Sequence, residues 1–346
     1  ELLNIGSGQY VSYFGYDYLG NRLTSRPSLN DFFSTDAQGN SNRTVGAFEP
    51  IYMAGYIQDQ FTFEDLFFNI GVRVDRFDAN QPVLADPFVL YPAYTVRQLD
   101  ATSLAGYNVP EGMSPDAVVY VDDQENPSSI VGYRDGFTWY TAAGEVEANP
   151  KNIADISGGI KPFLKKPGIE DQKLAVTADE SFKDYAPQVT VSPRVSFQFP
   201  ISDEAEFFAH YDILVQRPDP GLNRMNPITY LQLENGQNGS FLGNPDLKPE
   251  RAFANELSYS LNTVSTEFNL SVYYNYFNNY NFALNTGQRN NRYPSLFNYQ
   301  FEGVQAKRRG LEAILDMKVI SRIFLNVNTH FLIADVRNGN DDSWSA

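Results

Sequence analysis

Apolar and polar residues alternate along several stretches of this chain, which predicts β-strands that are apolar on one face only. The clearest stretch is 66–77, LFFNIGVRVDRF, where every second residue from Leu66 to Val74 is apolar. The same period recurs at 189–199, 207–216, 268–276 and 323–333, and aromatic and β-branched residues fill 9–19, 51–63, 252–262 and 303–318 less regularly. We therefore expect roughly nine or ten strands, most of them longer than the ~5–6 residues common in globular sheets.

The connections between these strands alternate strictly between short and long. Short links fall at 64–65, 200–205, 263–266 and 319–321, whereas long segments occupy 20–50, 79–187, 217–251 and 278–302. Outer-membrane barrels have this asymmetry, with tight periplasmic turns and longer extracellular loops, whereas a β-sandwich has turn signals every ~8–12 residues. We predict an all-β fold: a transmembrane antiparallel β-barrel of the outer-membrane type, in which 51–63 runs toward the periplasm and 66–78 runs outward.

The segment 79–187 is too long for an ordinary connection. It contains Pro-rich turn clusters and two short strand-like runs, VVYVDD and GFTWYTAA. Its low apolar content argues against an independently folded domain. We expect 1–346 to be part of a single transmembrane β-barrel domain, with 79–187 as a long extracellular loop, or a small insertion within it, that holds hairpins of its own.

Composition narrows the function classes. The formal net charge of -16 argues against a nucleic-acid partner, which needs a basic face. The chain has no cysteine, which excludes thiolate nucleophiles and Cys-based metal centres. It has two histidines, too few for a His-rich metal centre. The acidic pairs at 122–123 and 341–342 lack the spacing of a calcium loop. We therefore predict no enzyme activity, no cofactor and no metal. Separately, no apolar run approaches the ~20 residues of a membrane helix, so no helical membrane span is expected.

Two runs of the sequence crowd prolines and charges before a strand: QRPDPGLN, at 216–223, and GNPDLKPERAFANELSYSL, at 243–261. Together they resemble the most recognisable stretch of TonB-dependent outer-membrane receptors, in which an Arg-Pro element ends an outward strand and an Asn-Pro-x-Leu-Lys-Pro-Glu segment leads into the next. The matching residues are Arg217, Pro218, Asn244, Pro245, Leu247, Lys248, Pro249 and Glu250. Weaker likenesses at 55–78, 192–200 and 308–316 follow in the family's order.

The resemblance carries expectations about the whole molecule. Members of the family have an N-terminal plug domain and a barrel of about 22 strands, whereas this chain has no candidate plug and about ten strands. We therefore expect a fragment that lacks the plug and the terminal strands, and its aromatic-rich and Asn-rich loops resemble members of the Bacteroidota type. The implied location is the outer membrane of a Gram-negative bacterium. The implied partners are outer-membrane lipids, the TonB complex through a plug absent from this chain, and a surface lipoprotein or other envelope subunits.

Candidate site residues follow from the faces of the predicted strands and from the loops. Inward polar side chains of a barrel meet water, so Arg194 and His210 are candidate substrate contacts, and Arg73 and Glu256 are candidates for facing the plug. All four are alternatively structural partners within the lumen wall. Aromatic loop residues among amide side chains suit sugars, peptides or siderophores equally, and these are Tyr280, Phe282, Tyr293 and Phe297. Their alternative role is an aromatic girdle at the membrane interface.

Three functions fit these features. The first, implied by the resemblance, is an outer-membrane active-transport receptor that takes up a nutrient (siderophore, glycan or peptide) with energy from TonB. The second is a non-transporting barrel subunit or scaffold of an outer-membrane envelope assembly, which docks partners through its long loops. The third is a secreted soluble β-protein, such as an adhesin or a glycan-binding module, which would be released from membranes by salt without detergent.

Overall fold

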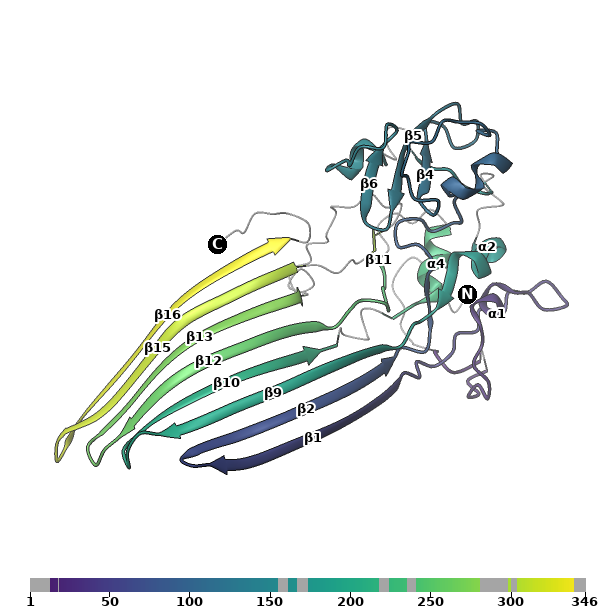
Figure 1. Cartoon of the computed structure of the whole chain (residues 1–346). Coiled ribbons are helices and arrows are strands. Elements are labelled where there is room, and N and C mark those ends of the chain that lie inside the picture. Colours follow the sequence, from purple (N-terminus) through teal and green to yellow (C-terminus); the bar gives the residue numbers. More distant parts are fainter. Residues whose placement is uncertain are drawn as a thin grey trace.

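Eight long strands form one curved antiparallel sheet (Figure 1). In sheet order they are β1 (Ile51–Phe63), β2 (Leu66–Asp78), β9 (Gln188–Pro200), β10 (Ala205–Gln216), β12 (Glu250–Asn262), β13 (Thr266–Tyr280), β15 (Val304–Ile320) and β16 (Ile323–Asn338). The computed structural model describes residues 13–17, 19–154, 161–166, 174–217, 224–234, 241–280, 298–299 and 304–338. All pairs of neighbouring strands in this sheet are antiparallel, which confirms the predicted fold class.

Short and long connections lie at opposite ends of the sheet. Four hairpins close through the short links 64–65, 201–204, 263–265 and 321–322. The long segments emerge at the other end, where the helices and a smaller sheet gather (Figure 1). We call these two ends the turn end and the loop end. The alternation of short and long connections that the sequence predicts is therefore confirmed.

The strand predicted at 9–19 is wrong over its described part, because the chain closes a tight turn there. The carboxylate of Asp17 accepts hydrogen bonds from the backbone N–H groups of Leu19 and Asn21, at 2.9 and 2.8 Å. Gly20 adopts a φ of +84°, which glycine reaches without strain. Such local side-chain bonding competes with a strand ladder. The main sheet consequently has eight strands in the described part of the chain, rather than nine or ten.

The register of the sheet separates an apolar face from a polar face. One row that crosses all eight strands contains Phe61, Phe68, Phe197, Ala209, Leu257, Val272, Leu311 and Phe331. The adjacent row, one residue along, contains Gln60, Asn69, Ser196, His210, Glu256, Tyr273, Gly310 and Leu332. Side chains of the apolar face remain exposed, as Ile57 at 72% and Phe331 at 61% illustrate. This alternation is the one that a barrel needs between lipid and a wet interior.

The loop end carries the helices and the shorter strands. These are α1 (Leu29–Phe33), β3 (Pro82–Leu84), a 3-10 helix (Val96–Ala101), β4 (Val118–Val121), β5 (Ile130–Asp135), β6 (Thr138–Thr141), a 3-10 helix (Pro150–Asn152), β7 (Lys161–Pro162), α2 (Leu174–Ser181), β8 (Phe182–Asp184), α4 (Pro227–Glu234), β11 (Phe241–Leu242) and β14 (Asn298–Tyr299). Strands β6, β5, β4 and β7 form a four-stranded sheet in that order. Among the described residues, no helix is long and apolar enough to cross a membrane.

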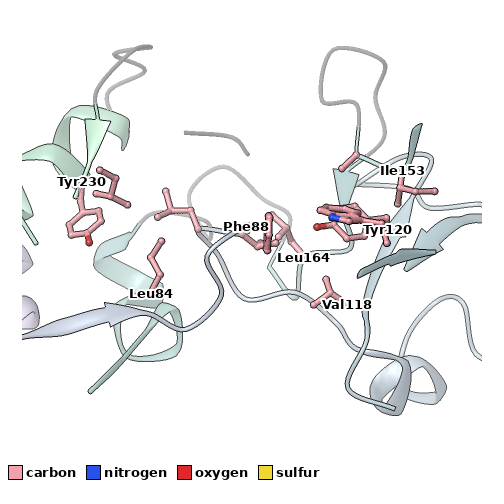
Figure 2. Packing of buried hydrophobic residues seen from close by; sticks show 12 residues of the cluster. Leu84, Phe88, Val118, Tyr120, Ile153, Leu164 and Tyr230 are labelled. Carbon is pink, nitrogen blue, oxygen red and sulfur yellow. The ribbon is translucent and has the colours of Figure 1, made fainter. Parts of the chain in front are cut away.

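Most of the buried apolar side chains lie at the loop end, not in the main sheet. One cluster lies within 99–163 and includes Val119, Val121 and Tyr133. A second cluster contains residues from different long segments (Figure 2). Leu84 and Phe88 come from the segment 79–187, whereas Tyr230 comes from α4 and Leu242 from β11. We call the packed described residues of 79–187 and 224–242 the cap. The described residues of 79–187 thus contain packed apolar clusters despite the low apolar content of this segment.

Candidate functional site

A hydrogen-bonded network lies on the polar face at the loop end of β1 and β2. The guanidinium of Arg73 donates to both carboxylate oxygens of Asp75, with Nε to Oδ2 and Nη2 to Oδ1 each at 2.9 Å, and to the hydroxyl of Tyr52 at 2.8 Å. The Tyr52 hydroxyl in turn donates to Asp75. Arg73 and Asp75 are two residues apart on one strand, so they share a face, and the register of β1 brings Tyr52 to them. Arg73 therefore has partners within the wall itself.

Arg217, the residue directly after β10, stacks on two aromatic rings at this network. Its guanidinium carbon lies 4.3 Å from the ring centroid of Tyr52 and 4.9 Å from that of Phe77, although β9 separates β10 from β2 in the sheet. Cations stack favourably on aromatic faces at these distances. Arg217 of the sequence motif thus links the end of β10 to the hairpin of β1 and β2. The sequence alone did not indicate this role.

We expect the replacement of Arg217 by alanine to destabilise the folded protein by about 1–2 kcal/mol, because two cation–π contacts are lost. Equilibrium urea unfolding of the full-length protein in lipid vesicles measures this change. A double-mutant cycle with Phe77→Leu serves as the control. A coupling near zero between the two sites would show that the stacking on Phe77 contributes nothing.

A cavity of about 720 Å³ lies beside this network. Its lining includes Thr190 and Ser192 of β9, both 6% exposed, and the exposed side chain of Arg194. Within the described part of the chain, no hydrogen bond or ion pair engages the Arg194 guanidinium. The structure therefore places the predicted contact Arg194 in a cavity with free donors. Thr190 and Ser192 were missed, although the two-residue period of 189–199 puts them on the same face as Arg194.

The predicted residues His210 and Glu256 lie further toward the turn end. They face each other on β10 and β12, and the Nε2 atom of His210 lies 3.8 Å from the Asp212 carboxylate. Neither His210 nor Glu256 lines the cavity that contains Arg194. The structure thus brings Arg73 and Arg194 to one cavity and leaves His210 and Glu256 on the polar face outside it.

A second polar contact crosses the sheet between β13 and β16. The hydroxyl of Tyr273 lies 2.6 Å from Nε2 of His330, and the intervening strand β15 contributes Gly310 at the crossing point. A β-carbon built on Gly310 would lie 2.5 Å from the Tyr273 hydroxyl oxygen and 2.5 Å from the carbonyl oxygen of Phe331. Glycine is therefore the residue that lets this aromatic side chain lie across the wall.

The Asn-Pro-x-Leu-Lys-Pro-Glu segment packs at the rim of the sheet. Asn244 is 7% exposed and its side-chain oxygen accepts a hydrogen bond from the backbone N–H of Asp246 at 2.9 Å. Leu247 is 2% exposed, and Gln188 at the start of β9 donates to its carbonyl oxygen at 3.3 Å. Asn244 thus forms an Asx turn that fixes the approach to β12, and the buried side chains of Asn244 and Leu247 hold this turn against the rim.

We expect Asn244→Ala to cost about 0.5–1.5 kcal/mol, because the N–H of Asp246 loses its side-chain acceptor. Asn244→Asp, which keeps an acceptor oxygen in the same place, is the matched comparison. Amide hydrogen exchange of the full-length protein reads the change at Asp246. Equal protection of that amide in the alanine and aspartate variants would argue against the Asx turn as the stabilising element.

Several predicted residues cannot be placed. Phe282, Tyr293, Phe297 and Pro218 lie outside the described residues, and Tyr280 ends β13 with its side chain outside them. In the pair 122–123, the hydroxyl of Ser128 and nearby backbone N–H groups hold the pKa of the Asp122 carboxyl well below its usual range. Those hydrogen bonds occupy the carboxylate oxygens of Asp122. Among the described residues, no group of three or more His, Cys, Asp or Glu side chains could hold a metal ion.

Comparison with known proteins supplies the family. The family model "TonB dependent receptor-like, beta-barrel" matches residues 2–344. No curated protein matches the chain.

Similar solved structures include the FrpB iron transporter from Neisseria meningitidis (F5-1 variant; 11% identity, 86% of this chain and 28% of that chain, TM-score 0.39). They also include the copper transporter OprC (10%, 88% and 34%, TM-score 0.38). A third is the alcaligin outer membrane receptor FauA from Bordetella pertussis (10%, 85% and 32%, TM-score 0.34). The chain spans about a third of the length of these proteins.

The family match covers nearly the whole chain and agrees with the antiparallel sheet, its two faces and its short and long connections. The chain belongs to the TonB-dependent receptor family and is a β-barrel protein of the Gram-negative outer membrane.

Proposed function

We propose that this protein is an active-transport receptor that takes up a nutrient, such as a siderophore, a glycan or a peptide, across the outer membrane with energy from TonB. The family match carries this proposal. The polar face supports it, because a wet wall with free donors suits the passage of a polar substrate. In this proposal TonB acts through a plug, and a surface lipoprotein or another envelope subunit is a further candidate partner.

The cavity beside Arg194 is the part of the wall that we assign to substrate contact. It has a size within the ~300–1,000 Å³ of small-molecule sites. The Arg73 network supplies rigidity next to it, since Arg73 already binds Asp75 and Tyr52. Arg194 supplies unengaged donors at its surface. Rigid surroundings and free donors together favour selective binding.

We expect Arg194→Gln to raise the half-saturating substrate concentration for uptake about tenfold, as loss of a charge-assisted hydrogen bond implies. Arg76→Gln is the matched control. It removes the same charge from β2, on the apolar face, where Arg76 lies 3.6 Å from Asp78. Uptake kinetics in cells that carry the full-length receptor measure both variants. Equal kinetics of the Arg194 variant and the wild type would remove Arg194 from the substrate path.

A genetic test addresses the function itself. Strains with the receptor gene deleted or complemented, each with and without TonB, are grown on a panel of single iron, glycan and peptide sources. We expect at least one source on which growth requires both the receptor and TonB, and that source identifies the substrate. If deletion changes growth on none of them and instead makes the envelope sensitive to detergent, the protein is a scaffold of an envelope assembly.

A further inference from the structure

A second cavity, of about 820 Å³, lies at the loop end outside the site beside Arg194. Four parts of the chain line it: residues 26–48, the exit of β2 at 78–82, the end of α2 with β8 at 178–185, and the residues 224–227 before α4. We call it the loop-end cavity. Its size is also within the ~300–1,000 Å³ of small-molecule sites.

Two hydrogen bonds on the C-terminal side of Arg224 hold its backbone in the wall of this cavity. The N–H of Met225, the next residue, donates to the side-chain oxygen of Gln81 at 2.9 Å. Asn226 then caps α4, because its side-chain oxygen accepts the N–H of Ile228 at 3.0 Å. The position of Arg224 is therefore fixed by the exit of β2 and by the start of a helix.

The guanidinium of Arg224 lies over the rings of two phenylalanines. Its central carbon lies 3.9 Å from the ring centroid of Phe14 and 6.0 Å from that of Phe48. Partial burial lowers the pKa of Arg224. Among the described residues, no acceptor receives a hydrogen bond from its N–H groups. A half-buried cation that lacks hydrogen-bond acceptors destabilises the folded protein unless a ligand supplies those acceptors.

Two neighbouring charged side chains of the cavity wall, Arg26 and Asp179, have hydrogen-bond partners. The guanidinium of Arg26 donates to the side-chain oxygen of Asn80. Asp179 accepts a hydrogen bond from the amide of Asn30 at 2.5 Å. Arg224 thus differs from Arg26, the other arginine of this wall, because no described residue accepts a hydrogen bond from its planar fork of donors.

We propose that the loop-end cavity binds a small organic ligand through an oxyanion, a carboxylate or a phosphate group, which accepts hydrogen bonds from the edge of the Arg224 guanidinium. An arginine fork matches the two oxygens of such a group, and aromatic rings on its faces leave that edge available. This inference rests on the proposed uptake function and names the chemical class of its ligand.

The test uses the full-length receptor, purified in detergent micelles and titrated calorimetrically with inorganic phosphate, citrate and trialanine with a free or an amidated C-terminus. We expect saturable binding of at least one oxyanion probe and none of amidated trialanine. Binding of phosphate alone assigns a phosphate ligand, and binding of citrate or free trialanine assigns a carboxylate. Absence of saturable binding for all three oxyanion probes overturns the proposal.

Variants locate the contact. Arg224→Gln is expected to weaken binding about 10–100-fold, and Arg224→Lys, which keeps the charge without the fork, by roughly threefold or more. Arg26→Gln removes a charge from the same wall and is expected to change binding less than about twofold. Wild-type affinity in both Arg224 variants, or an equal loss in the Arg26 variant, overturns the assignment. A wild-type receptor that binds no oxyanion probe but still shows TonB-dependent uptake contradicts this inference alone, whereas a receptor that binds a probe but shows no TonB-dependent uptake contradicts the proposed function alone.

Discussion

Replacement of Asp86 by alanine is expected to destabilise the cap by about 3–5 kcal/mol, the cost of leaving a buried cation without its partner. The side chain of Arg134 on β5 is 4% exposed and forms an ion pair with Asp86. Its remaining donors bind the Tyr120 hydroxyl at 3.2 Å and the Gly136 carbonyl at 3.0 Å. The guanidinium also stacks on Phe88, with the guanidinium carbon 4.6 Å from the ring centroid. These contacts stay in place when the carboxylate is lost, but they do not neutralise the charge.

Hydrogen exchange and limited proteolysis of the full-length protein measure this effect region by region. We expect faster exchange in β4, β5 and β6, and unchanged exchange in β2 and β9 of the main sheet. Asp116→Ala is the matched control, because it breaks an ion pair in the same segment whose side chains, Arg97 and Asp116, are 64% and 72% exposed. An exposed pair contributes about 0–1 kcal/mol. Equal effects of the two variants would contradict the buried pair as the centre of the cap.

The replacement of Gly310 by alanine is expected to destabilise the barrel wall by about 1–3 kcal/mol or more through overpacking. The new β-carbon would meet a backbone carbonyl oxygen of β16 at 2.5 Å, and this oxygen cannot move without disturbing the β15-β16 ladder. The same carbon would displace the Tyr273 ring and break its hydrogen bond to His330. We therefore expect both a loss of stability and a change at Tyr273.

Urea unfolding in vesicles gives the stability, and the fluorescence of single-tyrosine reporter variants follows Tyr273. The same Gly310→Ala change in a Tyr273→Ala background separates the two effects, since that double variant keeps the backbone clash but has no ring to displace. Gly55→Ala on β1, where no described atom lies within 4 Å of the new carbon, is the control and is expected to be neutral within about 0.5 kcal/mol. A neutral Gly310 variant would mean that the ladder absorbs the clash.

The sheet was predictable because its pattern is local. In β2 every second residue from Leu66 to Val74 is apolar, and the register aligns these residues with the apolar face of the neighbouring strands. The failure at 9–19 has the opposite cause, since the turn at Asp17 depends on one carboxylate and one glycine rather than on periodicity. Local sequence signals therefore account for both the correct prediction of the main sheet and the wrong strand at 9–19. The strand was predicted because the turn signal at Asp17 and Gly20 was missed.

The cap and the site were less predictable because their contacts join distant residues. Leu84 and Tyr230 share a core although nearly 150 residues separate them, and no periodic pattern reports such a pairing. Arg73 lies on the polar face, and its contact with Tyr52 depends on the register of β1, which the sequence alone does not give. Arg224 follows a motif arginine by seven residues in the sequence, and nothing there indicates that two phenylalanines enclose it. These contacts arise from tertiary packing, which a local sequence pattern does not report.

The core that joins Leu84 and Phe88 to Tyr230 and Leu242 limits how these outer segments can be exchanged. A chimaera that receives 79–187 alone would carry half of a hydrophobic interface into a barrel without its other half. The exposed half would favour aggregation, since large apolar patches in water do so. Residues 224–242 must therefore be transplanted with 79–187, and for engineering purposes the two segments form one module.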